Sequence, residues 1–256
     1  MTYRHALTDA QWAMVRLLVP SRPGPNPKLD DRTFIDAVLY RAKTGIPWRD
    51  LPERFGSWKT VYNRFSNWSL RGHWTAIFKA LQLEADDEGV IIDASVVRAH
   101  QDAAGGKGGS SAMRWVVLEV DSPRRSTPSS TRRGGPLHVQ LTPGQQHEST
   151  VAAAIIENHA RGKAFIADTG YDSDAIRNQL RSMRIKPVIH ANPTRKKKPR
   201  LDRRRYAVRY RVEVFFHDLK RFRALATRFE KTSRNYLALL QVACSMIWLQ
   251  DLTGGA

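Results

Sequence analysis

Two short apolar runs, each containing an aspartate, place the strongest constraint on how this chain can fold. The first, residues 89–97, begins with a glycine, is rich in β-branched side chains and contains Asp93. The second, residues 164–168, ends in Asp168 and leads into a glycine-containing turn. Runs of this length and composition are typical of buried strands. Because a carboxylate at a buried strand is costly unless it binds a partner, both aspartates are candidate site residues, although each could instead cap a turn.

Further strand and helix patterns alternate along the same part of the chain. Residues 136–142 alternate between apolar and polar side chains as a strand does, and residues 186–190 form another short strand candidate. Residues 148–160 and 173–183 have the pattern of helices. Strands that alternate with helices indicate an α/β fold. Residues 235–249, apolar on nearly every side, are expected to lie buried against that sheet.

The segment from Tyr206 to Lys220 has the spacing of one helix with a functional edge. Tyr206, Arg209, Glu213 and Lys220 fall within about 60° of one another on an α-helix, beside a stripe of apolar residues. Glu213 then has two interpretations. It can simply pair with Arg209 four residues before it, or it can join the two strand aspartates around a cation.

The chemistry open to three such carboxylates follows from their oxygen ligands, which suit hard divalent cations. Two ions held about 3.5–4 Å apart can activate a water or a 3′-hydroxyl and stabilise the leaving oxygen of a phosphodiester. Tyr206, Arg209 and Lys220, on the same helix face, would then hold the nucleic acid backbone. The three acids thus predict metal-dependent phosphodiester chemistry.

The net charge of the chain points to the same partner. Lys and Arg number 42 against 24 Asp and Glu, a formal charge of +18 that predicts a polyanionic partner, first of all double-stranded DNA. Part of the excess lies in the run 195–205, which contains Lys196, Lys197 and Lys198. Cys244 is the only cysteine, and no signal peptide or membrane-spanning run stands out, which fits a reducing cytoplasm.

Before residue 87 the sequence predicts a small all-helical leader domain. Four segments have apolar residues at helical spacing: 7–19, 31–43, 57–68 and 73–81. The last two flank a turn at Gly72, which on so basic a chain suggests a helix-turn-helix with Lys59 and Arg64 facing DNA. The alternative is that the aromatic residues here only build a helical core. We therefore expect a DNA-binding domain over 1–86 and a catalytic domain over 87–256.

Seven short motifs accompany the spacing of Tyr206, Arg209, Glu213 and Lys220. They are L-T-D-A-Q-W, T-G-I-P-W-R-D-L-P, F-G-S-W-K-T-V-Y-N-R-F, I-I-D-A-S-V-V-R-A-H, L-T-P-G-Q-Q-H-E-S-T, A-D-T-G-Y-D-S-D and L-A-T-R-F-E-K. Together they resemble the bacterial insertion-sequence transposases of the DDE type, and more narrowly the insertion sequence five family. The resemblance covers about residues 5–105 and 134–250.

This resemblance implies a ribonuclease H-like catalytic core preceded by a helical DNA-binding domain. It also implies that Asp93, Asp168 and Glu213 bind two Mg²⁺ ions, for which Mn²⁺ can substitute. The implied reaction is cleavage at the terminal inverted repeats of the element, followed by direct transfer of the cut strand to target DNA. Because two element ends must be brought together, a homodimer or larger assembly is expected, in the bacterial cytoplasm at the nucleoid.

Residues 110–133 depart from the family pattern. Relatives have Gly-Arg-Ser-Arg-Gly-Gly-x-Ser-Thr-Lys-Ile-His there, and one reverse translation of 113–123 reads Ala-Leu-Gly-Arg-Ser-Arg-Gly-Gly-Phe-Ser in a shifted frame. We therefore hypothesise that two compensating frameshifts bound this segment; the alternative is an ordinary divergent insertion. Residues 115–120 remain able to form a replacement strand, whereas 122–133 are expected to be a poorly ordered loop.

Three functions follow from these patterns. The first is an active transposase. The second is a DNA-binding protein derived from a transposase that no longer cuts well, because the altered segment displaces Asp93. The third is a basic nuclease that hydrolyses DNA without joining it. Metal-dependent cleavage separates the first from the second, and joined product separates the first from the third.

Overall fold

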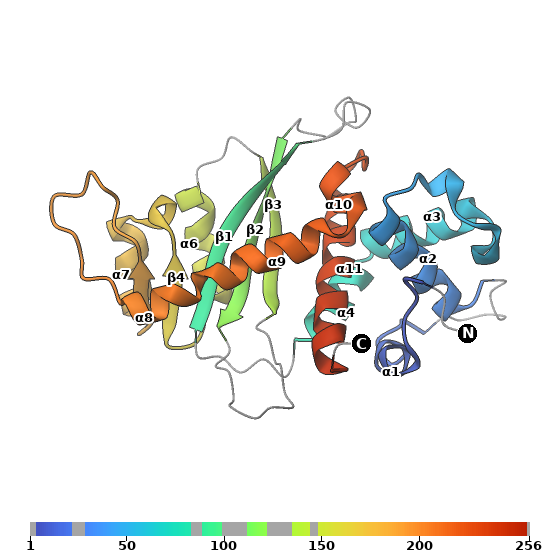
Figure 1. The fold of residues 1–256 in the computed structure, drawn as a ribbon, viewed down its shortest axis with the longest axis horizontal. Coiled ribbons are helices and arrows are strands. Elements are labelled where there is room, and N and C mark those ends of the chain that lie inside the picture. The colour runs from blue at the N-terminus through green and yellow to red at the C-terminus, as the bar shows by residue number, and fades with distance from the viewer. Residues whose placement is uncertain are drawn as a thin grey trace. The chain divides into compact units, whose positions relative to one another are not determined.

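The described part of the chain folds into two compact units. The computed structural model describes residues 4–21, 29–82, 89–98, 112–121, 135–143 and 148–254 (Figure 1). The helical unit contains the described residues of Met1–Leu83 and Asp218–Ala256, and the sheet unit contains those of Glu84–Val97 and Ala112–His217. None of the helices in the described ranges is long and apolar enough to cross a membrane.

The helical unit begins with the four helices that the sequence predicts, joined by two 3₁₀ turns. Its elements before residue 83 are α1 (Asp9–Val15), α2 (Asp31–Thr44), η1 (Trp48–Asp50), η2 (Glu53–Phe55), α3 (Trp58–Leu70) and α4 (His73–Ala80). Thr8 caps α1 reciprocally, since the Gln11 N–H donates to its hydroxyl at 3.2 Å and its own N–H donates to the Gln11 side chain at 3.1 Å. Helix α1 ends at Val15, earlier than the expected residue 19.

Two C-terminal helices complete this unit: α10 (Arg223–Thr227) and α11 (Ser233–Leu252). Helix α11 packs against α2, α3 and α4, and α10 packs against α2. The expectation that the sheet buries residues 235–249 is therefore wrong, because helices bury them. The domain boundary at residue 87 stays a prediction. An all-round apolar pattern shows that a helix is buried but does not identify what buries it.

A buried ion pair ties the C-terminal segment into this unit. Glu230 accepts from the Trp48 indole N–H at 2.8 Å and pairs with Arg41 at 3.2 Å. Both charged side chains are almost fully buried, 3% exposed for Arg41 and 7% for Glu230. Loss of one partner of such a pair leaves an uncompensated buried charge, so this contact is a sensitive point of the helical unit.

The sheet unit is built on five strands in the order β3-β2-β1-β4-β5. They are β1 (Gly89–Arg98), β2 (Ala112–Asp121), β3 (Pro136–Pro143), β4 (Ala164–Ala167) and β5 (Lys186–Ile189). β2 and β3 are antiparallel, whereas β4 is parallel to both β1 and β5. The helices α6 (Glu148–His159) and α7 (Asp174–Ser182) also belong to this unit, and Ser173 caps α7 through the N–H of Ile176.

The two faces of the sheet are used differently. On one face, Val90, Ile92, Phe165 and Ala167 join a buried cluster with apolar residues of α6 and α7. Because successive side chains of a strand alternate, Asp93 points to the other face. The segment after β5 crosses this second face: it contains α8 (Arg203–Tyr206), η4 (Ala207–Arg209) and α9 (Tyr210–Lys220), and α8 packs on β4 and β5 (Figure 1).

The altered segment contributes the strand β2 to this sheet, with one shift of its register on β3 between Leu118 and Glu119. β2 pairs with β3 along the register that sets Trp115 opposite Leu141 and Val117 opposite Val139. Trp115 is fully buried and its ring stacks on Phe216 of α9 at 6.4 Å. The expectation that residues 115–120 can form a replacement strand is therefore confirmed. The expected loop over 122–133 lies outside the described residues.

Candidate active site

The strand register places Asp93 and Asp168 side by side. In the parallel pair of β1 and β4, Ile91 lies opposite Ile166. β4 ends at Ala167, but Asp168 is still extended at φ −81° and ψ −172°, so continuing this register by two residues would bring Asp93 opposite Asp168. Neighbouring strands lie about 4.8 Å apart and paired residues point to the same face. The two predicted carboxylates therefore share one face of the sheet.

The two aspartates differ in their position along their strands. Asp168 directly follows β4, as the sequence predicts. Asp93 lies in the middle of β1 rather than at its end, because β1 continues to Arg98 whereas its partner β4 stops at Ala167. Asp93 therefore lies near the end of the part of β1 that pairs with β4, although β1 itself continues beyond it.

The helical segment that bears Glu213 is not one uniform α-helix. The segment from Tyr206 to Lys220 is helical throughout, as the sequence predicts, but Ala207–Arg209 form the 3₁₀ turn η4 between α8 and α9. The backbone tightens at Tyr206, with φ −63° and ψ −31°, and at Tyr210, with φ −54° and ψ −23°. A 3₁₀ turn has about 3.0 residues per turn, and Tyr206 still forms a side-chain hydrogen bond with Arg209 across it.

Arg209 connects two of the three acids. Its Nη1 donates to Glu213 Oε1 at 2.9 Å and to Asp93 Oδ2 at 3.3 Å. The other Asp93 oxygen accepts from the backbone N–H of Ala94 at 2.8 Å. Asp93 is 15% exposed and Arg209 20%, whereas Glu213 is 62% exposed. The simple helical pair of Arg209 and Glu213 is thus present, and the same guanidinium also reaches the strand aspartate.

The charge of Arg209 is reinforced by its neighbours. Burial disfavours the charged guanidinium, but Asp93, Tyr206 and Glu213 outweigh it, so the pKa of Arg209 is raised above its ordinary value. Tyr206 contributes both as a nearby ionisable group and through a side-chain hydrogen bond to Arg209. The guanidinium therefore supplies a permanent positive charge between two carboxylates.

Asp168 makes a local contact instead. Its carboxylate accepts from the N–H of Gly170 at 2.9 Å and caps the 3₁₀ turn η3 (Thr169–Tyr171). Within the described ranges, no three His, Cys, Asp or Glu side chains are grouped closely enough to hold a metal ion together. The structure therefore links Asp93 and Glu213 through Arg209, whereas Asp168, directly after β4, bonds its own turn.

Sequence reasoning missed His190, which extends the row of Asp93 and Asp168. β4 and β5 pair in parallel with Ala167 opposite Ile189, and the His190 N–H donates to the Ala167 carbonyl at 3.3 Å. His190 therefore stands opposite Asp168, and its ring lies 5.7 Å from that of Tyr206. The signal was available, since His190 follows an apolar strand directly, as Asp168 does.

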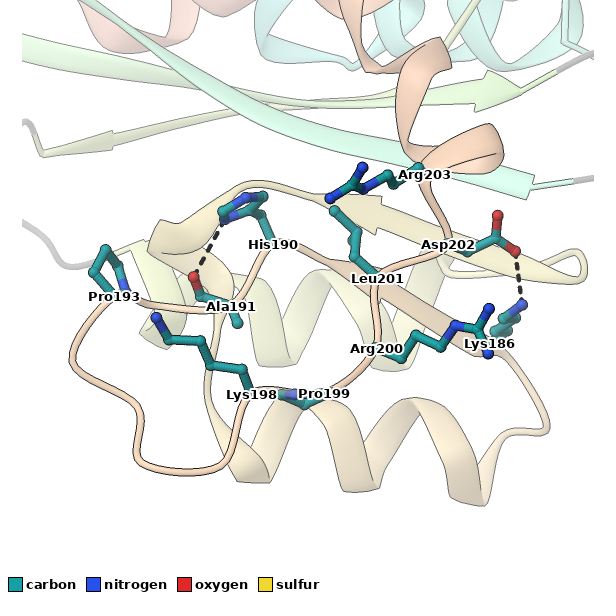
Figure 2. Close-up of a pocket in the computed structure, with 10 residues that line it drawn as sticks. All are labelled: Lys186, His190, Ala191, Pro193, Lys198, Pro199, Arg200, Leu201, Asp202 and Arg203. Atoms are coloured by element: carbon teal, nitrogen blue, oxygen red, sulfur yellow. Dashed lines mark hydrogen bonds and ion pairs between the residues drawn. The ribbon is translucent and has the colours of Figure 1, made fainter.

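The basic run forms an exposed loop between β5 and α8. Lys196, Lys197 and Lys198 are exposed, whereas Arg195 pairs with Asp174. The loop borders an open pocket of about 1060 Å³, shown in Figure 2 and lined by Lys186, His190, Ala191, Pro193, Lys198, Pro199, Arg200, Leu201, Asp202 and Arg203. Cations thus gather on one edge of the sheet unit.

The predicted DNA-contacting residues of the helical unit divide into one exposed and one buried side chain. Lys59 is exposed near the start of α3. Arg64 is only 9% exposed, pairs with Asp31 and lies over the Phe34 ring at 4.1 Å. The stem and guanidinium of Arg64 thus fill space between α2 and α3, and a contact of Arg64 with DNA stays a prediction. Lys220, the last residue of α9, belongs to the helical unit and is exposed.

Two protein families match the chain. The family described as "Putative transposase of IS4/5 family" matches residues 7–78, and the family described as "Transposase DDE domain" matches residues 84–248. The first match covers the helices α1 to α4, and the second contains Asp93, Asp168 and Glu213.

Individual relatives agree with these matches. "Uncharacterized protein y4sN" of Sinorhizobium fredii is 42% identical over 119 residues, which are 44% of this chain and 95% of that protein. "Putative transposase for insertion sequence element IS6501" of Brucella ovis is 36% identical over 118 residues, 46% of this chain and 91% of that protein. Both similarities thus cover less than half of the present chain.

A solved structure shares the fold. The piggyBac transposase in its synaptic complex with hairpin DNA, determined by cryo-electron microscopy, aligns with a TM-score of 0.52 and 9% identity, over 95% of this chain and 71% of that chain. At that identity the likeness concerns the fold alone. The "Transposase DDE domain" match spans more than half of the 256 residues, and this chain therefore belongs to the DDE transposases of bacterial insertion sequences.

Proposed function

We propose that this chain cleaves DNA at the ends of an insertion sequence and transfers the cut strand to target DNA. The observation that supports this most is the parallel register of β1 and β4, whose continuation beyond Ile91 and Ile166 would bring Asp93 beside Asp168 on one face of the sheet. Glu213 is joined to Asp93 through Arg209 on the same face. The strand order β3-β2-β1-β4-β5, with a helical segment bearing the third acid, supports a ribonuclease H-like core.

The three carboxylates fit divalent cations by the chemistry of their donors. Asp93, Asp168 and Glu213 offer only oxygen atoms, which Mg²⁺ and Mn²⁺ prefer to nitrogen or sulfur. Arg209 already places a positive charge beside two of them, which indicates that this position stabilises a cation. A pair of divalent ions would supply activation of the attacking oxygen and stabilisation of the leaving oxygen.

The other side chains of the site would bind and position DNA. Arg209 would leave the carboxylates when cations bind and would then be free to contact a phosphate, which a planar guanidinium binds through two parallel hydrogen bonds. Tyr206 would orient Arg209 through their hydrogen bond. In the helical unit, Lys220 would bind the DNA backbone. Lys59 and the three lysines of residues 196–198 would bind the backbone elsewhere.

A second candidate function has its own support. The contacts of Arg209 and the turn made by Asp168 keep the carboxylates from forming a three-ligand group among the described residues, which favours a DNA-binding protein that cuts poorly. The hypothesised frame shift over 110–133 would add to this. Replacing that segment by the shifted-frame peptide separates the two: a large gain in cutting favours the impaired protein, and equal cutting favours an ordinary insertion.

The partner in both proposals is double-stranded DNA, and the test uses DNA that carries the terminal inverted repeats. With Mg²⁺, the wild-type protein should release element ends and give joined product. The variants Asp93→Asn, Asp168→Asn and Glu213→Gln should each shift the same DNA in a gel yet leave it uncut. Cutting without joined product would indicate a nuclease, and undiminished joining by any of the three variants would remove that residue from the site. We propose a dimer or larger assembly in the bacterial cytoplasm, which light scattering of the DNA complex would test.

A further inference from the structure

We infer that the pocket between β5 and the basic loop is a preformed site for the backbone of DNA, with His190, Lys198, Arg200 and Arg203 as its contacts. The inference rests on the proposed function, since it takes DNA as the partner. It goes beyond an exposed lysine run, because it assigns the binding to a pocket and identifies the buried carboxylate of Asp172 as an anchor of the loop that borders it.

The start of the loop is anchored by Asp172, a residue outside the loop whose side chain is fully buried. Its Oδ1 accepts from Arg177 at 2.7 Å, and its Oδ2 accepts from the Asn192 N–H at 2.7 Å and from Arg195 Nε at 3.1 Å. Arg195 reaches on to Asp174 at 2.7 Å. Burial opposes the charge of Asp172, but the Asn192 N–H and the two guanidiniums outweigh it and lower the pKa of that carboxyl. Residues 192–195 are thus held by charge-assisted hydrogen bonds.

The second fixed point is Asp202, at the far end of the loop. It pairs with Lys186 of β5 at 2.7 Å and accepts from the N–H of Arg205, which caps α8 (Figure 2). The loop is therefore held at residues 192–195 and at 202, and the stretch 196–201 runs between the two points. A loop fixed at both ends has less conformational entropy to lose when a ligand orders it.

The stretch between the fixed points has a charge that no neighbour balances. It contains Lys196, Lys197, Lys198 and Arg200 and no acid, and Arg203 follows at the start of α8. Lys198, Arg200 and Arg203 are exposed and make no ion pair with any described residue. Asp202, the one acidic residue that lines the pocket, is already paired with Lys186. A pocket with this excess of cations suits a polyanion.

The position of the pocket indicates which polyanion. His190 lines it and also stands opposite Asp168 in the strand register, in line with Asp93. The His190 ring neighbours Tyr206, which hydrogen-bonds Arg209. A DNA strand whose phosphates lie on Lys198, Arg200 and Arg203 would therefore pass His190 and reach the acids. An acidic peptide has no comparable reason to bind beside these carboxylates.

The test compares two triple variants of the full chain in a background of Asp93→Asn, so that DNA is bound without being cut. The first changes Lys198, Arg200 and Arg203 to Gln. The second changes Lys163, Arg181 and Arg184 to Gln, which removes three exposed charges elsewhere in the sheet unit. Affinity for a short duplex of unrelated sequence is measured by fluorescence anisotropy over a range of salt concentrations.

The pocket variant should bind more weakly, and its salt slope should fall by about 2–3, because each lost phosphate contact removes about 0.9 from the slope. The control variant should change the slope by less than about one. An equal loss of DNA affinity in both variants, or no loss in either, would overturn the inference. It would also be overturned if the pocket variant lost binding to an acidic peptide but kept its affinity for DNA. Absence of cleavage by the wild-type protein would contradict the proposed function alone, since binding is measured without it.

A second comparison tests whether the loop is preformed. Asp172→Asn would leave the buried Arg177 without its carboxylate, so Arg195 is the better position to change. Arg195→Lys keeps the charge but cannot bridge Asp172 and Asp174, and Lys196→Arg is the matched control in the same loop. Arg195→Lys should weaken DNA binding about 3- to 10-fold, because one or two more side chains must then become ordered when DNA binds. The same variant should be cleaved faster by trypsin after Lys196 and Lys197. Wild-type affinity and tryptic resistance in Arg195→Lys would refute a preformed pocket.

Discussion

Replacing Arg209 by Gln should increase the affinity of the DNA-free protein for divalent cations. Arg209 holds Glu213 at 2.9 Å and Asp93 at 3.3 Å, so a cation that binds these carboxylates must first displace the guanidinium. Gln at this position removes the positive charge, so the ion pairs with Asp93 and with Glu213 are both lost. The same change should weaken DNA binding, because the freed guanidinium is proposed to contact phosphate.

The size of the effect follows from the two ion pairs. A hydrogen bond to a charged group contributes about 1.5–3 kcal/mol when shielded, whereas an exposed pair contributes about 0.2–1 kcal/mol. Asp93 is 15% exposed, so the energy of its pair with Arg209 should lie between these two ranges. Glu213 is 62% exposed, so the energy of its pair with Arg209 should lie at the lower end. A sum of about 1–2.5 kcal/mol corresponds to a gain in affinity of about 5- to 70-fold.

The assay is isothermal titration of the DNA-free protein with Mn²⁺, and two further variants separate displacement from simple charge. Arg209→Lys keeps the charge on a shorter side chain that cannot hold both acids, and it should gain part of the affinity. Arg205→Gln removes one charge four residues earlier and should gain little, because Arg205 lies near Asp202 rather than near the site acids. Weaker or unchanged Mn²⁺ binding by Arg209→Gln, or an equal gain in Arg205→Gln, would refute the reasoning.

Three further outcomes follow from the charged groups of the two units. Glu230→Gln should lower the free energy of unfolding of the helical unit by about 3–5 kcal/mol in chemical denaturation, because it leaves Arg41 buried without a counter-charge; a loss below about 1 kcal/mol would contradict this. Burial beside the Phe222 ring, with Arg221 nearby, lowers the pKa of Lys43 from 10.5 to about 8, although Asp218 opposes the shift. The charged Lys43 therefore destabilises the folded state fully below about pH 8, and this penalty shrinks as the pH rises to about 10.5. Lys43→Met should therefore be more stable than wild type by about 1–2 kcal/mol at pH 7, a value discounted for partial exposure, and the advantage should shrink as the pH rises; a constant advantage would contradict the cause given. Changing Lys196, Lys197 and Lys198 to Ala should reduce the salt slope of DNA binding by about one per lost contact, and an unchanged slope would identify them as solvated loop only.

Much of the fold follows from local patterns that tertiary contacts did not override. The strands around Asp93 and Asp168 and the helices of the leader form where the hydrophobic period and the caps at Thr8 and Ser173 place them. Even the altered segment supplies a strand, because Trp115 and its apolar neighbours can be buried between β3 and α9 whatever their origin.

What the patterns could not provide was the identity of packing partners. The apolar α11 could be recognised as buried, but its partners α2, α3 and α4 lie far away in sequence. Arg64 has the position of a DNA-facing residue on its helix, yet its pair with Asp31 across the helical unit depends on how two helices pack. A sequence pattern gives the face of an element and not the element that covers it.

The candidate site shows the same division between local and long-range information. The pair of Arg209 and Glu213 can be predicted from their spacing along a helix. Asp168 can be predicted as a site residue from its position directly after a buried strand. The contact between Arg209 and Asp93, and the row that adds His190, depend on strand register between distant segments. Register could be inferred only once the order of the strands was known.

Crystals of the protein soaked in Mn²⁺, measured for anomalous scattering, test the central claim most directly. We expect an anomalous peak bonded at about 2.1 Å to oxygens of both Asp93 and Asp168, with Arg209 moved away from Asp93 and Glu213 turned toward the ion or a second one. The peak should vanish in Asp168→Asn. An anomalous map without a peak between these strands, or a peak that leaves Arg209 bridging Asp93 and Glu213, would contradict the assignment of the three acids to one metal-dependent site.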